Sequence, residues 1–169
     1  MKNTLIIREK ILTFTATTGV PMAYFINHIH LKSPDPKKSA DWWIEAFGFT
    51  IESDNVRDSG DRFIRCISES GLAVNISNER TGEVLGKGDA TAHYGLEHFG
   101  FDSENLEADI ARLEALGAKL VDGPRGADPR ICFIACPDDV RIELIERPQN
   151  DPRFIWGPPS PTFTIDGPD

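Results

Sequence analysis

The feature that most constrains how this chain of 169 residues can fold is an internal repeat. The segment from Asn27 to Ser33 aligns with the segment from Glu97 to Ser103, since both alternate apolar and polar residues and both lead into a helical pattern. The alignment continues along the chain, with residues 62–68 over 130–136 and residues 72–77 over 140–145. Chance similarity between two α+β stretches is the alternative explanation. The repeat favours the order strand, helix and three strands, present twice.

Each copy contains one helix with recognisable ends. The first predicted helix covers residues 36–47, where Asp35 can cap the N-terminal turn and a proline occupies the first helical position. The second covers residues 106–116. Each helix stops at a glycine, Gly48 or Gly117, as a left-handed C-terminal cap requires. The glycines therefore predict where both helices end.

The repeat also predicts the domain organisation. Residues 1–21 are expected to form an N-terminal arm, and residues 22–148 one domain. Its modules are expected at about 24–78 and 95–147, and residues 149–169 are expected to form a proline-rich, aromatic C-terminal tail. So many prolines in the tail are incompatible with a regular helix or a central strand.

Composition excludes several classes of partner. The formal net charge is −9, which disfavours binding to nucleic acid and to anionic membranes. No apolar stretch has the length of a membrane span. The three cysteines (Cys66, Cys132 and Cys136) are too few and too unevenly spaced for a disulfide scaffold, which favours a reducing cytoplasm. A small-molecule partner fits these exclusions best.

Strand alternation sets one polar residue of each of four strands opposite an apolar face. These residues are His28, Asn75, His98 and Glu143. The repeat pairs His28 with His98 and Asn75 with Glu143, so a pseudo-twofold arrangement would bring all four side chains toward one cavity. His30 shares the strand face of His28 and is expected to line the same cavity.

Four motifs resemble the vicinal oxygen chelate superfamily, which includes glyoxalase I, methylmalonyl-CoA epimerase, extradiol dioxygenases and fosfomycin-resistance proteins. The motifs are Asn27-His-Ile-His-Leu-Lys-Ser-Pro-Asp-Pro-Lys-Lys-Ser39, Phe47-Gly48-Phe49, Gly95-Leu-Glu-His-Phe-Gly-Phe101 and Pro137-Asp-Asp-Val-Arg-Ile-Glu-Leu-Ile145. The resemblance covers residues 24–147. It implies an α+β fold in which two tandem βαβββ modules form a curved, largely antiparallel eight-stranded sheet around an open cavity.

The resemblance also implies a metal site. Ligands in this superfamily come from the first, fourth, fifth and last strands, which correspond here to His28, position 75, His98 and Glu143. Position 75 departs from glyoxalase I and the epimerase, because Asn75 is a shorter and weaker ligand than their carboxylate or glutamine. Two histidines and one carboxylate remain, a set that suits one divalent ion such as Fe, Mn, Zn or Ni. Asn75 is then expected to reach the metal through water or to bind substrate.

Two reactions follow from the resemblance, an extradiol-dioxygenase-like one and a glyoxalase-like lyase or isomerase reaction. In the isomerase form Glu143 would abstract a carbon-bound proton; in the dioxygenase form it would stay on the metal, and His30 would be the candidate for proton transfer. A non-catalytic protein that binds a small molecule or antibiotic is the alternative. Arg130 is a candidate for binding an anionic substrate group, with surface solvation as its other role. Related proteins build the cavity within one chain or across a homodimer, and both arrangements stay open here.

Overall fold

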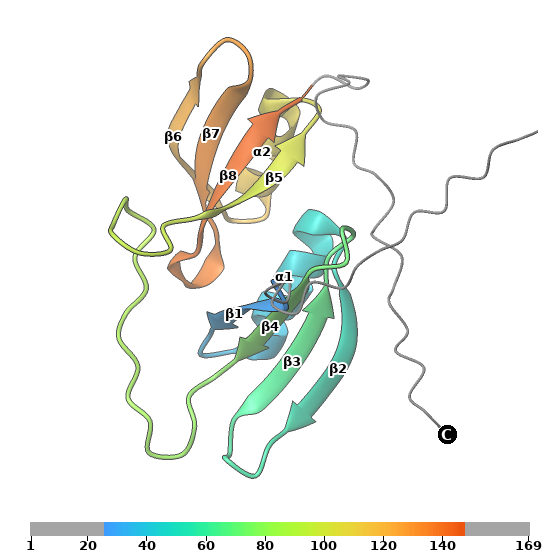
Figure 1. The fold of residues 1–169 in the computed structure, drawn as a ribbon, viewed down its shortest axis with the longest axis vertical. Helices are drawn as coiled ribbons and strands as arrows, with labels where there is room; N and C mark the ends of the chain where they lie inside the picture. Colours follow the sequence, from blue (N-terminus) through green and yellow to red (C-terminus); the bar gives the residue numbers. More distant parts are fainter. Residues whose placement is uncertain (1–25, 148–169) are drawn as a thin grey trace, which may run out of the picture.

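The computed structural model describes residues 26–147, and the expected N-terminal arm and C-terminal tail lie outside them. The first module contains β1 (His28–Lys32), α1 (Pro36–Phe47), β2 (Thr50–Val56), β3 (Arg62–Ile67) and β4 (Ala73–Ser77). The second contains β5 (Phe99–Ser103), α2 (Leu106–Ala115), β6 (Lys119–Arg125), β7 (Arg130–Ala135), the 3₁₀ turn η1 (Pro137–Asp139) and β8 (Arg141–Glu146). The predicted duplication of a βαβββ unit is confirmed (Figure 1).

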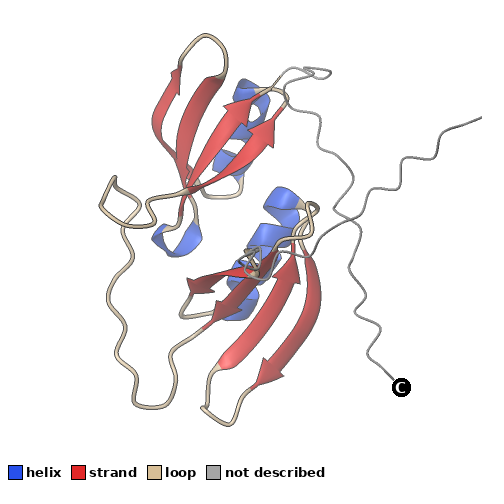
Figure 2. Ribbon diagram, viewed as in Figure 1, coloured by secondary structure: helices blue, strands red, loops and turns tan. Residues whose placement is uncertain are grey.

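The eight strands form two four-stranded sheets with the same topology. Their orders are β1-β4-β3-β2 and β5-β8-β7-β6, and in each sheet the first pair is parallel while the others are antiparallel. Each helix lies against one face of its own sheet (Figure 2). The α+β class and the tandem modules are as expected, but the single eight-stranded sheet is divided. In the part of the chain that the structure describes, the β1 and β5 edges are not hydrogen-bonded to each other.

Local sequence explains both helices. Asp35 caps α1, its carboxylate accepting a hydrogen bond from the Lys38 backbone N at 3.1 Å, and Asn105 caps α2 in the same way. Gly48, at the end of α1, and Gly117, just beyond α2, have φ of 67° and 92°, a left-handed conformation that side chains with a Cβ rarely adopt. The caps fix where the chain turns back toward each sheet.

An aromatic cluster joins the two modules. Trp43 of α1 is buried, and its ring lies 5.9 Å from that of Phe99 and 6.4 Å from that of Phe101, both on β5. Phe47 stacks on Phe101 at 4.2 Å between ring centroids. Trp42 also crosses the boundary, donating from Nε1 to the Leu116 carbonyl at 2.9 Å. The modules therefore associate through α1 and β5 side chains rather than through strand pairing, which explains the divided sheet.

All three cysteines are buried and free. Burial raises the pKa of Cys66, on β3, and of Cys132, on β7, to about 11. It raises the pKa of Cys136 as well. These thiols are therefore neutral core side chains at physiological pH. Among the helices between residues 26 and 147, none is long and apolar enough to cross a membrane.

Candidate functional site

Strand register places His30, Asn75 and Glu143 on the sheet faces that point away from the helices, whereas His98 lies just before β5. On the first sheet, His30 lies opposite Asn75, and Asn75 lies opposite Arg65. On the second sheet, Glu143 lies between Gly100 and Phe133. The alternation in the sequence predicted these faces, because every second residue of a strand points to the same side.

His98 and Glu143 are brought together in the second module. His98 Nε2 lies 3.5 Å from Glu143 Oε2, and the His98 Nδ1 hydrogen-bonds to the carboxylate of Glu97. The ring of Phe133 meets the imidazole edge-on at 5.1 Å. When Nδ1 donates its proton to Glu97, the lone pair of Nε2 faces the Glu143 carboxylate, an arrangement that suits a cation bound between the two side chains.

Arg141 holds Glu97 in place. Its Nε lies 2.7 Å from Glu97 Oε1, its Nη1 donates to the Ala90 carbonyl at 2.9 Å, and its guanidinium lies 4.3 Å over the ring of Phe133. Arg141 is buried. The hydrogen bond from His98, with the charge of Arg141, holds the pKa of Glu97 below its usual value. Glu97 is therefore a fixed, ionised acceptor behind the imidazole.

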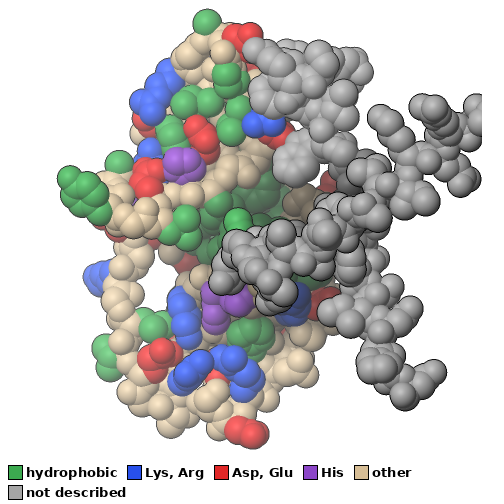
Figure 3. Space-filling view, viewed as in Figure 1, with side chains coloured by type: hydrophobic (Ala, Val, Ile, Leu, Met, Phe, Trp, Pro, Cys, Tyr) green, Lys and Arg blue, Asp and Glu red, His purple; other side chains and the backbone are tan. Residues whose placement is uncertain are grey.

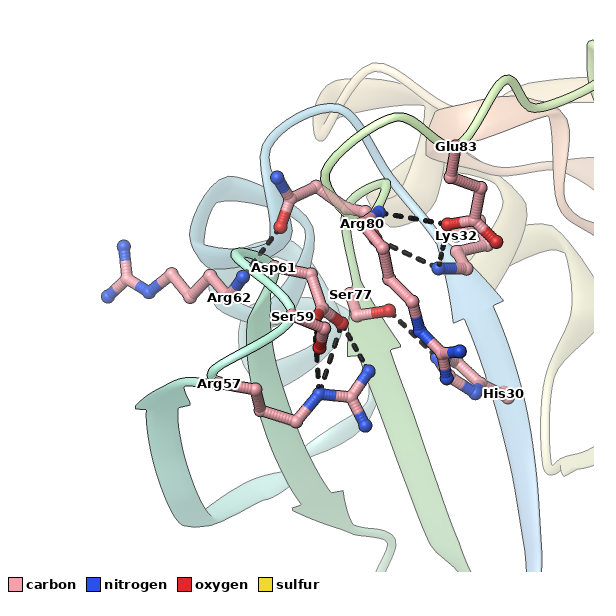
Figure 4. Close-up of polar contacts among 10 residues, drawn as sticks. His30, Lys32, Arg57, Ser59, Asp61, Arg62, Ser77, Arg80 and Glu83 are labelled. Carbon is pink, nitrogen blue, oxygen red and sulfur yellow. Dashed lines mark hydrogen bonds and ion pairs between the residues drawn. The ribbon is translucent and has the colours of Figure 1, made fainter.

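Two histidines lie on the first module. His28 is exposed, its Nδ1 donates to Asn27 Oδ1 at 2.9 Å, and its ring is 6.4 Å from that of His30. His30 Nε2 lies 3.0 Å from Ser77 Oγ (Figure 4), and its ring meets Phe63 at 5.4 Å. Partial burial lowers the pKa of His30, and nearby positive charges lower it further. His30 is thus favoured as a neutral imidazole.

Asn75 is buried at 5% exposure and belongs to the same face. Its Oδ1 accepts a hydrogen bond of 3.4 Å from Arg65 Nη1. Arg65 in turn pairs with Glu52. The amide oxygen that would be Asn75's metal-binding atom is therefore already engaged by a cation.

The two halves of the predicted site are not assembled into one cluster. Within residues 26–147, no group of three His, Cys, Asp or Glu side chains is close enough to hold a metal ion. Histidine is exposed over each module, with hydrophobic side chains between (Figure 3). A cleft of about 310 Å³ between the modules is lined by His30 and His98, together with Glu97 and Arg141. Arg130 lies elsewhere, paired with Glu107 of α2 and with Glu146 of β8.

Sequence reasoning missed Glu97 and Arg141. Arg141 is two residues from Glu143 on the same strand, so alternation alone places both on one face. Glu97 precedes the strand, where alternation gives no guide. Its signal was the sequence Glu97-His98, a carboxylate next to a candidate ligand.

The chain belongs to the Glyoxalase/Bleomycin resistance protein/Dioxygenase superfamily, whose family model matches residues 25–144. A search of curated proteins gave no match. This membership confirms the resemblance seen in the four sequence motifs.

Solved structures of the superfamily share the fold. A glyoxylase/bleomycin resistance protein/dioxygenase domain from Frankia sp. EAN1pec is 19% identical, with a TM-score of 0.60 over 76% of this chain and 95% of that chain. The fosfomycin resistance protein FosX of Listeria monocytogenes, complexed with Mn(II) and sulfate, is 17% identical, with a TM-score of 0.57 over 76% and 96%. A mutant of glyoxalase I from Zea mays is 19% identical, with a TM-score of 0.57 over 73% of this chain but only 45% of that chain.

Proposed function

We propose that this protein is a divalent-metal-dependent enzyme that binds a small oxygenated substrate by chelation, with His98, Glu143 and His28 as the metal ligands. The observation that supports this most is the approach of His98 Nε2 to Glu143 Oε2 at 3.5 Å, with Glu97 behind the imidazole. A metal-binding histidine almost always donates its remote ring N–H to a carboxylate, a backbone carbonyl or a water molecule. The Mn(II) in the related FosX structure agrees with a divalent ion.

The residues present fit such an ion chemically. Imidazole nitrogen and carboxylate oxygen suit Fe, Mn, Zn and Ni, and Glu97 directs His98 so that its free lone pair faces Glu143. When bound, the ion would supply Lewis-acid stabilisation of negative charge on substrate oxygens. Asn75, held by Arg65, is assigned to substrate binding rather than to the metal.

Two chain residues are candidates for moving protons. Glu143, whose side chain is only 17% exposed, would accept a carbon-bound proton in a lyase or isomerase reaction. His30, with its lowered pKa and its contact to Ser77, would move a proton in an extradiol-dioxygenase-like reaction. Oxygen consumption with catechols, against isomerisation of a hemithioacetal, separates the two reactions.

We assign His28 to the site through a second copy of the chain. One copy does not bring His28 together with His98 and Glu143, and the β1 and β5 edges are unpaired in the described sheets. An open strand edge is a ready site for association. A homodimer in which each copy supplies His28 to the other would complete two identical centres, as twofold symmetry requires.

A metal-binding experiment tests the proposal. The full chain, purified without oxygen, is expected to hold about one divalent ion per site, and His98→Ala to lose it while retaining its circular dichroism spectrum. His93→Ala is the matched control, because the hydrogen bonds of the His93 ring go to the backbone carbonyls of Thr91 and Leu96. Full metal occupancy in His98→Ala would refute the ligand assignment.

A non-catalytic binding protein is the second candidate. It is favoured by the lack of a three-residue ligand cluster among residues 26–147. Its cleft would then hold a small molecule or antibiotic without metal. Absence of bound metal from both aerobic and anaerobic preparations would give this candidate first place.

A further inference from the structure

The tight turn between β2 and β3 contains a carboxylate that is unusual for a loop. The side chain of Asp61 is fully buried. Aspartate is almost never fully buried unless it is paired, because removing its charge from water is unfavourable. Asp61 accepts hydrogen bonds from Arg57 Nε, at 3.2 and 3.1 Å to its two oxygens, from Arg57 Nη2 and from the Ser59 hydroxyl. These bonds hold its pKa well below the usual value.

This arrangement fixes the guanidinium of Arg57 in one position. Its Cζ lies 4.2 Å from the ring centroid of Phe63 on β3. The turn itself is locked, because the Ser59 carbonyl accepts from the Thr81 N at 2.9 Å and Gly60, with φ 88°, leaves no room for a Cβ beside Thr81. Little conformational freedom is left for Arg57 to lose when it binds a ligand.

Arg57 belongs to the same sheet face as the first-module histidines. The ring of Phe63 lies 5.4 Å from that of His30, and the ring of His30 lies 6.4 Å from that of His28. Ser77, opposite Phe63 in register, is the hydrogen-bond partner of His30. Figure 4 shows Arg57 and His30 on the same side of β3 and β4, with the Asp61 carboxylate next to the guanidinium.

The guanidinium has hydrogen-bonding capacity left. Asp61 engages Nε and Nη2, no hydrogen bond from Nη1 is found within residues 26–147, and the side chain is 35% exposed. Asp61 cancels the formal charge, but it lies on the buried side, so an incoming ligand meets the donors first. A planar guanidinium with free N–H groups matches the geometry of carboxylate, phosphonate and phosphate oxygens.

We propose that Arg57, positioned by Asp61, binds an anionic group of the substrate. The substrate would thus carry a carboxylate, phosphonate or phosphate group separate from the oxygens that chelate the metal. This inference rests on the proposed function only in assigning the anion to the substrate of the metal centre.

The test titrates the metal-free full chain with inorganic phosphate and, separately, with acetate, and follows binding by calorimetry and by arginine side-chain NMR. The wild type is expected to bind at least one anion, and Arg57→Gln to bind it at least about tenfold more weakly. A preference for phosphate indicates a phosphate or phosphonate substrate, and a preference for acetate indicates a carboxylate.

Two further variants separate binding from folding. Arg57→Gln leaves Asp61 buried without its cation, so the double variant R57Q/D61N restores neutrality and is expected to fold without regaining anion binding. Arg62→Gln is the matched control, because Arg62 is also paired with a carboxylate, that of Asp54, but points away from His30 (Figure 4).

The inference is overturned if the wild type binds neither anion, if R57Q/D61N binds as tightly as wild type, or if Arg62→Gln weakens binding equally. Because the titration uses no metal, its failure is distinguishable from failure of the metal centre. If the chain binds metal but no anion, the proposed function stands and this inference fails. If it binds an anion but no metal, the anion site stands and the proposed function fails.

Discussion

Glu97 and His98 are neighbours in the chain and hydrogen-bond partners in space, with the Glu97 carboxylate accepting from His98 Nδ1. Adjacent residues of an extended strand would point to opposite sides, but Glu97 and His98 both lie just before the start of β5, where this restriction does not apply. The bond selects the ring nitrogen that faces Glu143. One chain therefore positions His98, Glu97 and Glu143 relative to one another without help from a second copy.

Glu97→Gln is expected to weaken divalent-metal binding about tenfold to a hundredfold, because the neutral amide is a poorer partner for the His98 ring. Calorimetric titration with Mn(II) and Zn(II) measures the change. Glu114→Gln, at an exposed position of α2, is the control and should bind as wild type does. If Glu97→Gln bound metal as tightly as the wild type, the Glu97 carboxylate would have no influence on metal binding by His98.

Mixing two variants that each lack one proposed metal ligand tests whether two copies of the chain form the metal site together. His28→Ala and His98→Ala each lack one ligand, and in a symmetric dimer one of the two sites of a mixed pair retains both histidines. Metal binding is therefore expected to return to roughly a quarter of the sites after full exchange of subunits. Atomic absorption of the mixture, against each variant alone, measures it. A centre formed within one chain would give no recovery.

Trp43→Ala is expected to lower the free energy of unfolding by about 3–5 kcal/mol, the range for loss of a large buried aromatic side chain. Trp43 is 1% exposed and touches both modules. Urea denaturation followed by circular dichroism gives the value. Tyr94→Ala, at a fully exposed position between β4 and β5, should change stability by less than about 0.5 kcal/mol.

Asp61 should make stability depend on pH in the acidic range. Its pKa is lower in the folded protein than the ordinary value of about 3.9, so its stabilising contribution is fully present above that value and is lost as pH falls toward the folded pKa. The difference in unfolding free energy between wild type and Asp61→Asn should be largest near pH 7 and shrink below about pH 4. Urea midpoints from about pH 3 to pH 7 test this. A constant difference would contradict it.

The sequence was sufficient for the repeated part of the fold. The glycines after both helices and the alternation in residues 28–31 and 140–144 are local signals, and they led to the observed helices and strand faces. The strand β6 (Lys119–Arg125) is less regular than the others. Its register shifts on both sides of Asp122, and such irregularities leave no periodic pattern in the sequence.

Contacts between residues that are far apart in the sequence could not be predicted from it. The division into two sheets depends on how Trp43 and Phe47 pack on β5, and side-chain packing across modules has no local signature. Arg57 and Asp61 lie in a turn, to which neither strand nor helix periodicity applies. The guanidinium of Arg130, a candidate for binding an anionic substrate group, pairs with Glu107 and Glu146, which are far from it in the sequence.

The buried cysteines can be used to measure local opening of the native structure. Cys66 lies in β3 and Cys132 in β7, one in the third strand of each module, and each thiol is fully buried. A thiol reagent can modify them only when the surrounding strands open, so labelling rates under native conditions measure the local opening of each half separately. The ratio of the two rates would reveal whether the duplicated halves unfold as one cooperative body or as two.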